Sequence, residues 1–458
     1  MRKLSRIAAL AVLFAGRLWA ADLPVLDPAR VTEKTLPNGL QVVVKEERQW
    51  PVVAVSAFIR AGSVYEADKE AGVAHLVEHM LFEATGDDNQ KLAPSIEALG
   101  GRISATTMRD FVHVDIIVAS RYLEQVLPLL TKAVFEAPFT AAQMTRELSV
   151  VKREMEDRRD RADVYADEMI WRLAYKQHPY GRPIGGTASD LAALSFDTVA
   201  AFHKRFYVPN NIAFVAVGDV EPAWLSGKLT ELTAKYPAVP TGWTAPALEP
   251  PPTEPRIKID NLPREVSLLN MAWQAPSIAD KADVCAMDLL YTVLGQGSLG
   301  RLTAKLVNEQ KVLLTADAEF LTQKYPGLLV LTAVVSPGRE AEAQAAILGE
   351  IKRLADEPLS AAELARAKRL LYTEYAFSNE SYDDQMGSMG FYASIDNYRF
   401  ALDYISTVMA ATPEQLQAVA RKYLGASNFS LGILQGKRNG RPDDQARLFT
   451  ANEAAMLP

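Results

Sequence analysis

Residues 72–85 read GVAHLVEHMLFEAT, and apolar side chains recur in this stretch at helical spacing. His75, Glu78 and His79 interrupt the apolar pattern, and their i, i+3, i+4 spacing places them on one helix face. Two imidazoles four residues apart can bind one zinc ion, while a carboxylate beside them can take a proton from zinc-bound water. The stretch therefore predicts a hydrolytic zinc site, with a pair of structural helix histidines as the alternative. The predicted helix covers residues 70–84, and its apolar side is formed by Val73, Leu76, Val77, Met80 and Leu81.

A zinc ion that catalyses hydrolysis needs a third protein ligand and one open position for water. The third ligand should be a carboxylate or a histidine on another element. Glu147 and Glu154 are candidates, because they lie seven residues apart on one face of a predicted helix. The mixed-charge run over residues 152–161 is also typical of a solvated helix face. Spacing alone therefore leaves the choice among these and other nearby glutamates open.

The segments around the motif show both strand and helix patterns. Pro37-Asn38-Gly39 is a strong hairpin signal, because Asn-Gly can adopt the positive φ angles of a tight turn. Long helical patterns occupy residues 122–175, and Gly100-Gly101 ends another predicted helix. Strands are predicted where β-branched and apolar residues dominate, at Thr32–Leu36, Leu40–Lys45, Val52–Arg60, Arg102–Thr107, Phe111–Ala119 and Ile212–Val217.

A proline-rich segment divides the chain nearly in half. Five of the ten residues over 246–255 are proline, which is typical of a stiff extended linker. The two halves are similar, because residues 139–146 match residues 359–366 at an offset of 220 and Glu154 falls on Glu374. Chance likeness between two amphipathic helices is the alternative. We predict an α+β fold of two homologous domains, each a mainly antiparallel sheet with helices packed on it.

The composition suits two globular domains, which we expect over residues 21–245 and 256–458. Hydrophobic residues make up 49% of the 458 residues, and the formal charge of −7 without a basic tail argues against a nucleic-acid partner. Cys285 is the single cysteine, which excludes a disulfide scaffold and a multi-cysteine metal site. Gly295–Gly300 matches a dinucleotide-binding fingerprint, but a helical pattern precedes it. We therefore predict a loop between two helices there.

The first twenty residues have the pattern of a secretory signal peptide. Arg2, Lys3 and Arg6 give a positive start, Ile7–Gly16 is apolar, and cleavage is expected after Ala20. The apolar run is about half the length of a bilayer-spanning helix, so a membrane anchor is the weaker alternative. No later segment is long and apolar enough to span a bilayer. We expect an exported protein, located in the periplasm if its source is a Gram-negative bacterium.

Five stretches carry a resemblance to a known family: Pro37–Leu40, Gly72–Thr85, Arg146–Glu154, His178–Pro183 and Phe206–Asp219. In them the chain resembles the pitrilysin/insulinase family of zinc metallopeptidases, in its two-domain branch that includes mitochondrial-processing-peptidase-like proteins. The order His-x-x-Glu-His is the inverzincin signature of such enzymes. The resemblance is dense over the first half of the chain and looser over the second half.

The resemblance implies a role for each residue of the predicted site. Family members carry a glutamate, six residues and a second glutamate after the histidine motif, and 74 residues separate His79 from Glu154 here. The implied zinc ligands are His75, His79 and Glu154, and the implied general base is Glu78. Glu147 is then a supporting carboxylate that orients the ligands.

The family binds its substrate as an added strand on a sheet edge, where backbone hydrogen bonds supply affinity with little sequence demand. Gly101–Thr107 resembles that edge strand, which implies Ser104, Ala105 and Thr106 as substrate-binding residues. Relatives usually carry asparagine at the position of Ser104, so we expect a changed substrate contact there. The resemblance as a whole implies a zinc endopeptidase acting on peptides or unfolded segments, with an inactive second domain.

The second domain departs from the family at two positions. An arginine and a tyrosine seven residues apart help to hold the substrate at the zinc in relatives, whereas Asn308 and Thr315 stand there in this chain. Some two-domain relatives are heterodimers in which one chain carries zinc and the other carries the arginine–tyrosine pair. We therefore expect a homologous partner subunit. The alternatives are a non-catalytic scaffold, including a chain inactivated by drift, and a peptide-binding module without turnover.

Overall fold

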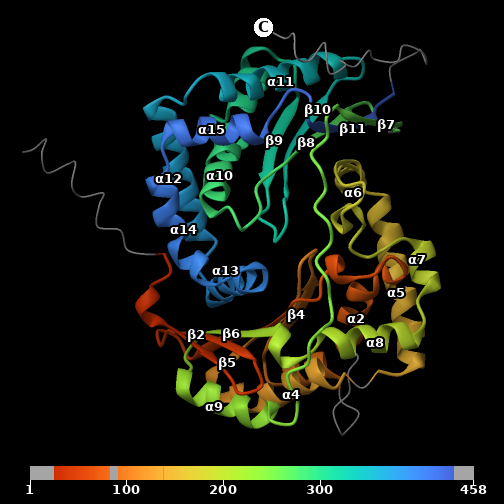
Figure 1. The fold of residues 1–458 in the computed structure, drawn as a ribbon, viewed down its shortest axis with the longest axis vertical. Coiled ribbons are helices and arrows are strands. Elements are labelled where there is room, and N and C mark those ends of the chain that lie inside the picture. Colours follow the sequence, from red (N-terminus) through yellow and green to blue (C-terminus); the bar gives the residue numbers. More distant parts are fainter. Residues whose placement is uncertain (1–24, 83–90, 138, 262, 438–458) are drawn as a thin grey trace, which may run out of the picture.

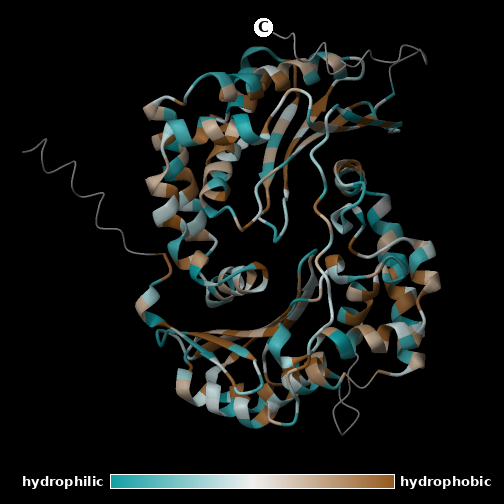
Figure 2. Ribbon diagram, in the orientation of Figure 1, coloured by the Kyte–Doolittle hydropathy of each residue, from teal (hydrophilic) through white to brown (hydrophobic). Residues whose placement is uncertain are grey.

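The computed structural model describes residues 25–82, 91–137, 139–261 and 263–437, which form two sheet-and-helix domains (Figure 1). The predicted signal peptide over residues 1–20 lies outside the described residues. Within the described part of the chain, no helix has both the length and the apolar character needed to cross a membrane. Strands of both sheets are mostly hydrophobic, and the outer helices carry hydrophilic stripes (Figure 2).

The first sheet contains six strands in the order β1-β2-β6-β3-β5-β4. β2 and β6 are parallel, and the other neighbours are antiparallel, so the predicted mainly antiparallel sheet is confirmed. β4 lies at the edge of this sheet. The strands are β1 (Val31–Thr35), β2 (Gln41–Glu46), β3 (Val52–Ile59), β4 (Arg102–Thr107), β5 (Val112–Ala119) and β6 (Ile212–Gly218).

The helix that carries the His-x-x-Glu-His motif, α2, begins at Val73 rather than at the predicted residue 70. The reason is Gly72, whose φ of +87° is left-handed and does not continue a helix. Residues 83 and 84 of the prediction lie outside the described residues. The helices of this half are α2 (Val73–Phe82), α3 (Leu92–Ala98), α4 (Leu123–Phe135), α5 (Ala141–Arg159), α6 (Ala162–Ala174), α7 (Ala188–Ala193), α8 (Phe196–Phe206) and α9 (Pro222–Thr233), with short turns η1 (Pro28–Arg30), η2 (Ser63–Tyr65), η3 (Asp68–Glu70), η4 (Ser120–Tyr122), η5 (Pro179–Gly181) and η6 (Pro209–Asn211).

The second sheet has the order β7-β11-β8-β10-β9, and β7 and β11 form its parallel pair. The loop after Gly295 follows helix α10 rather than a strand, so the predicted loop is confirmed at the fingerprint-like sequence. Cys285 is buried in the same helix. The elements are β7 (Arg256–Asn261), β8 (Ser267–Gln274), α10 (Lys281–Gly295), the π-helical η7 (Leu302–Glu309), β9 (Thr315–Phe320), β10 (Leu328–Val335), α11 (Glu340–Asp356), α12 (Ala361–Phe377), α13 (Tyr382–Ile395), α14 (Arg399–Ala410), α15 (Pro413–Tyr423) and β11 (Phe429–Gln435).

The two halves repeat one topology, which confirms the predicted duplication. The strand order β2-β6-β3-β5-β4 corresponds to β7-β11-β8-β10-β9, and the parallel pair occupies the same place in both sheets. Helices α5 and α12 begin at residues 141 and 361, and α6 and α13 begin at residues 162 and 382. Both pairs have the offset of 220 that the sequence shows.

The halves exchange one helix each. α13 of the second half packs on β3 and β6 of the first sheet, whereas α6 of the first half packs on β8 and β11 of the second sheet. A Cβ at Gly390 of α13 would lie 1.9 Å from Phe58 Cε2, so only glycine allows this close approach. At Gly432 of β11 a Cβ would lie 2.6 Å from the terminal methyl group of Met169 on α6, a flexible end that can shift, so this contact is less restrictive.

Arginines from the opposite half hold the ends of the exchanged helices. Arg60 donates to the carbonyl oxygen of Ala393 at 2.6 Å, at the C-terminal end of α13. Arg256 donates in the same way to the carbonyl oxygen of Ala174 at 2.6 Å, at the end of α6. A cation at a helix C-terminus satisfies free carbonyl groups and complements the helix dipole. The two halves are therefore joined by reciprocal polar contacts as well as by packing.

The proline-rich segment is extended and is attached to the first half through one buried side chain. The Glu249 carboxylate accepts hydrogen bonds from the backbone N–H groups of Gln177 and His178, at 2.7 and 3.1 Å. Its other oxygen lies 3.0 Å from the Arg256 guanidinium. This glutamate therefore fixes the path of the connection between α9 and β7.

A buried aspartate, Asp288 of α10, makes stability depend on pH. Its carboxylate accepts a hydrogen bond from Tyr404 at 2.8 Å, and burial raises the pKa of Asp288 to about 7. In the unfolded chain the Asp288 carboxyl group ionises near pH 3.9, so the folded state holds the proton of this group more tightly. The contribution of Asp288 to stability should therefore decrease as pH rises from about 4 to 7, by at most about 1.4 kcal/mol per pH unit.

Asp288→Asn should remove this contribution, because asparagine does not ionise. Its free energy of unfolding, measured by denaturant titration between about pH 4 and 7, should have a more positive slope against pH than that of the unsubstituted protein. Asp317→Asn on β9 is the control, since Asp317 is exposed. Equal slopes for the Asp288 variant and the unsubstituted protein would contradict the assignment.

Candidate metal centre

The start of α2 is fixed by a buried carboxylate, Glu66. Its two oxygens accept hydrogen bonds from the backbone N–H groups of Gly72 and Ala74, at 3.1 and 3.0 Å. These N–H groups have no partner within the helix, so Glu66 supplies an N-terminal cap. The side chain of Arg182 in turn donates to the Glu66 carbonyl oxygen at 3.1 Å. The first turn of α2, which leads into His75, is therefore held by polar contacts.

His75, His79 and Glu154 converge on one point between α2 and α5. The Nε2 atoms of the two histidines lie 3.1 Å apart. Glu154 Oε2 lies 3.7 Å from His75 Nε2 and 3.5 Å from His79 Nε2. These are the three residues that the sequence resemblance implies as ligands, and the fold brings all of them together.

The spacing of these three atoms fits a zinc ion. Zinc–nitrogen and zinc–oxygen bonds of about 2.0–2.2 Å in a tetrahedral site place neighbouring ligand atoms about 3.3–3.5 Å apart. Separations of 3.1, 3.5 and 3.7 Å bracket this value. Burial lowers the pKa of His75 to about 4, so its ring is neutral at pH 7, as a metal ligand must be. An ion held by these three atoms would have its fourth position open for water.

Two further side chains contact residues of the cluster from outside. Glu147 Oε2 lies 3.5 Å from Nδ1 of His79, the ring nitrogen that faces away from the cluster. Arg158 lies one turn beyond Glu154 on α5, and its guanidinium is 3.6 Å from Oε1, the carboxylate oxygen that the cluster does not use. Groups in such positions orient metal ligands and tune the affinity for the metal. Glu147 therefore lies where a supporting carboxylate was predicted.

Glu78 lies on the same helix but outside the ligand cluster. The residue is 8% exposed, and its carboxylate accepts a hydrogen bond from Thr107 Oγ1 at 2.8 Å. Burial raises the pKa of Glu78 above its ordinary value, although the Thr107 hydrogen bond acts in the opposite direction. A carboxylate with a raised pKa next to a metal position suits proton transfer to and from water.

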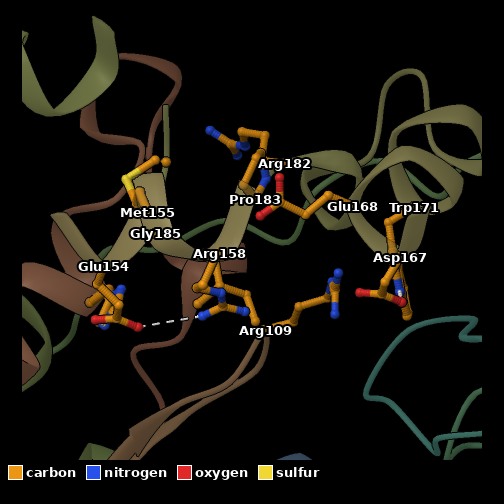
Figure 3. Close-up of a pocket in the computed structure, with 13 residues that line it drawn as sticks. Arg109, Glu154, Met155, Arg158, Asp167, Glu168, Trp171, Arg182, Pro183 and Gly185 are labelled. Carbon is orange, nitrogen blue, oxygen red and sulfur yellow. Dashed lines mark hydrogen bonds and ion pairs between the residues drawn. The ribbon is translucent and has the colours of Figure 1, made fainter. Parts of the chain in front are cut away.

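A cavity of about 60 Å³ opens beside His75 and Glu154. Arg158 lies between Glu154 and Arg109 in this cavity (Figure 3). Arg109 is fixed, because its guanidinium lies 3.5 Å from the centre of the Trp171 ring. The remaining wall includes Asp167, Glu168, Arg182 and Gly185.

The predicted substrate-binding residues lie on β4, next to α2. Ser104 and Thr106 are exposed, whereas Ala105 is half-buried on the opposite face of the strand. β4 pairs with β5 on one side only, so the other edge of the strand is unpaired within the described sheet. Thr107, which ends the strand, reaches Glu78 and is the link between this edge and the site.

Sequence reasoning missed three of these residues. Arg158 sits four residues after Glu154, a helical spacing at which charges pair, so its contact with the ligand could have been inferred. Thr107 shares the inner face of β4 with Ala105, which strand alternation indicates. Glu66 precedes the helix start by several residues and gives no local signal. Asn308 and Thr315 lie exposed on η7 and β9 of the second half.

Two family models match the chain in sequence. Residues 41–188 match the model described as insulinase (peptidase family M16), and residues 193–371 match the model described as the peptidase M16 inactive domain. The first match contains the whole ligand cluster and Glu78. The second begins in the first half and covers much of the second half.

Relatives and solved structures agree with these matches. A probable mitochondrial-processing peptidase subunit beta from Arabidopsis thaliana is 27% identical over 75% of this chain and 66% of that protein. The zinc protease PqqE from Helicobacter pylori is 25% identical over 85% of this chain and 89% of that protein. A crystal structure of a protease from Helicobacter pylori covers 88% of this chain and 99% of its own, with a TM-score of 0.81 and 22% identity. The last likeness concerns the fold.

Proposed function

Because the chain belongs to the insulinase family of peptidases (peptidase family M16), we propose that it is a zinc-dependent endopeptidase that hydrolyses peptides or unfolded segments. The observation that carries this proposal is the cluster of His75, His79 and Glu154, whose atoms are spaced as a tetrahedral zinc site requires. Glu78 beside the cluster supplies the proton-transfer group that hydrolysis also needs.

Each side chain of the site has a defined task in peptide hydrolysis. Bound zinc supplies Lewis-acid chemistry, polarising the scissile carbonyl and lowering the pKa of water from about 15.7 towards 7. Glu78 takes one proton from the attacking water and delivers it to the leaving amine, as the carbon–oxygen bond forms and the carbon–nitrogen bond breaks. Glu147 keeps the His79 ring in the orientation that presents Nε2 to the metal.

The edge strand β4 is the place where a peptide binds in this proposal. An extended peptide adds to the sheet beside Ser104, Ala105 and Thr106, and its backbone pairs with theirs. Such pairing depends on hydrogen bonds to the peptide backbone rather than on contacts with its side chains, so it suits substrates that are unfolded and varied in sequence. Because Thr107 at the end of β4 touches Glu78, the bound peptide lies close to the general base.

We further propose that the chain is the catalytic member of a heterodimer, exported after removal of residues 1–20 and located in a periplasm. The replacement of an arginine–tyrosine pair by Asn308 and Thr315 supports the need for a homologous partner subunit. The alternative within the family is a non-catalytic scaffold or a peptide-binding subunit. It is disfavoured by the presence of the three ligands and Glu78 together.

Zinc content and cleavage, measured on purified residues 21–458, test this proposal. We expect about one zinc ion per chain and cleavage of an unstructured peptide that a chelator abolishes and added zinc restores. Cleavage that appears only with an arginine- and tyrosine-bearing homologue would support the heterodimer, and full activity of the chain alone would contradict it. Zinc binding without cleavage in either case would favour the peptide-binding alternative, and absence of zinc binding would favour the scaffold.

A further inference from the structure

We infer that the hydroxyl group of Thr107 positions the Glu78 carboxylate for proton transfer. Thr107 Oγ1 donates a hydrogen bond to Glu78 Oε2 at 2.8 Å, and both side chains are buried. The inference deepens the proposed function and rests on it, because it concerns the general base of the same reaction. It makes Thr107 a positioning residue, which acts on the reaction through Glu78.

The sheet fixes the place of this hydroxyl group. Side chains alternate along β4, so that Ser104 and Thr106 are exposed while Thr107 is buried on the face of Ala105. The backbone of Thr107 pairs with Val112 of β5, which anchors the end of the strand. The donor is therefore held by the sheet, whereas its acceptor is carried by α2.

The contact adds a directional restraint to a side chain that has several torsions. Glutamate has three side-chain torsions, and α2 fixes only the backbone of Glu78. A hydrogen bond to one carboxylate oxygen selects one orientation and leaves the other oxygen to exchange a proton with water. Threonine is suited to this task because its hydroxyl is a neutral donor, and β-branching limits its own rotation.

The same hydrogen bond joins the substrate-binding edge to the reacting group. Ser104, Ala105 and Thr106, beside which the peptide is added, directly precede Thr107, the residue that holds Glu78. Positioning of a proton-transfer group has a large effect on rate, since small displacements of a reacting group are costly. Loss of the hydroxyl should therefore reduce turnover rather than peptide binding.

Four variants test this role in the assembly in which the unsubstituted protein is active. Thr107→Val keeps the size of the side chain and removes the hydroxyl, while Thr107→Ser keeps the hydroxyl. Thr131→Val is the matched control, because Thr131 is also buried in this half and its hydroxyl donates to the Leu127 carbonyl oxygen at 2.8 Å, away from the site. Thr107→Ala replaces Thr107→Val if the latter does not fold.

We expect Thr107→Val to lower kcat by about 10- to 100-fold, with KM, zinc content and melting temperature close to those of the unsubstituted protein. Thr107→Ser should restore most of kcat, and Thr131→Val should leave it unchanged. An unchanged kcat in Thr107→Val and Thr107→Ala, or a loss in Thr107→Ser equal to that in Thr107→Val, would overturn the inference alone. Absence of zinc-dependent cleavage by the unsubstituted protein would overturn the proposed function as well, so the two failures are distinguishable.

Discussion

Glu78→Gln should reduce peptide cleavage by about 10²- to 10⁴-fold while leaving the zinc content of the protein unchanged. Glutamine has the size of glutamate, and its amide oxygen can still accept the hydrogen bond from Thr107. It cannot take a proton from water, so the proton-transfer step is lost. Glu78 lies outside the ligand cluster, and zinc binding through His75 and His79 therefore persists.

Elemental analysis and steady-state kinetics on the same preparation measure both parts of this prediction. Glu97→Gln is the matched control, because Glu97 is exposed on α3 of the same half and makes no contribution to the cluster. It should keep the kcat and the zinc content of the unsubstituted protein. Retained turnover in Glu78→Gln would show that another group transfers the proton. Loss of zinc in this variant would instead place Glu78 among the ligands.

The sequence predicted the repeated architecture because the repeat is local. The similarity around residues 139–146 and 359–366 lies at the starts of α5 and α12, where Thr140 and Ser360 cap the helices in the same way. Such caps depend on residues three positions apart and are visible in sequence. The offset of 220 then carried over to the next helices, α6 and α13.

The exchange of α6 and α13 between the two halves could not be predicted in this way. An amphipathic pattern shows that a helix has an apolar face, but it does not identify the sheet that this face covers. The contacts that determine the partner join residues far apart in the chain, such as Gly390 with Phe58 and Arg60 with Ala393. In sequence, a glycine within a helix also indicates lower helix stability rather than a close approach to another element.

The candidate site was predictable on α2 and ambiguous on α5. His75, Glu78 and His79 are one turn apart, so helical geometry alone brings them together. Glu147 and Glu154 share a face of α5, and only the crossing of α5 over α2 separates their positions. Glu154 reaches Nε2 of both histidines, whereas Glu147 reaches Nδ1 of His79. The resemblance to the family had implied the same division, which stays a prediction until metal binding is measured.

The details that sequence reasoning missed depend on the path of the backbone. The helix start shifted to Val73 because Gly72 adopts a left-handed conformation, which the periodic apolar pattern does not reveal. In the hairpin at residues 37–39, Gly39 has a positive φ while the Asn38 side chain instead binds the Thr233 carbonyl oxygen at 3.0 Å. The predicted hairpin is nevertheless confirmed, since β1 and β2 pair antiparallel across this turn.

Glu154→Gln should weaken zinc binding by about 100-fold or more, because it replaces a charged ligand with a neutral amide. The substitution also leaves the Arg158 guanidinium, 3.6 Å from Oε1, without its negative partner. Glu147→Gln should weaken zinc binding less, by about 10- to 100-fold. The reason is that Glu147 contacts Nδ1 of His79, whereas Nε2 is the ring nitrogen that faces the metal position. Competition with a chelator of known affinity measures the dissociation constants of both variants.

The order of the effects along α5 is the decisive part of this prediction. Glu156→Gln provides the control, because Glu156 is exposed two residues beyond Glu154 and should bind zinc as the unsubstituted protein does. A ligand, a supporting carboxylate and a solvent-exposed carboxylate on one helix should therefore differ in the order Glu154, Glu147, Glu156. A larger effect for Glu147 would exchange the two roles. Equal and small effects for all three would mean that α5 supplies no ligand, so that His75 and His79 alone would have to hold the metal.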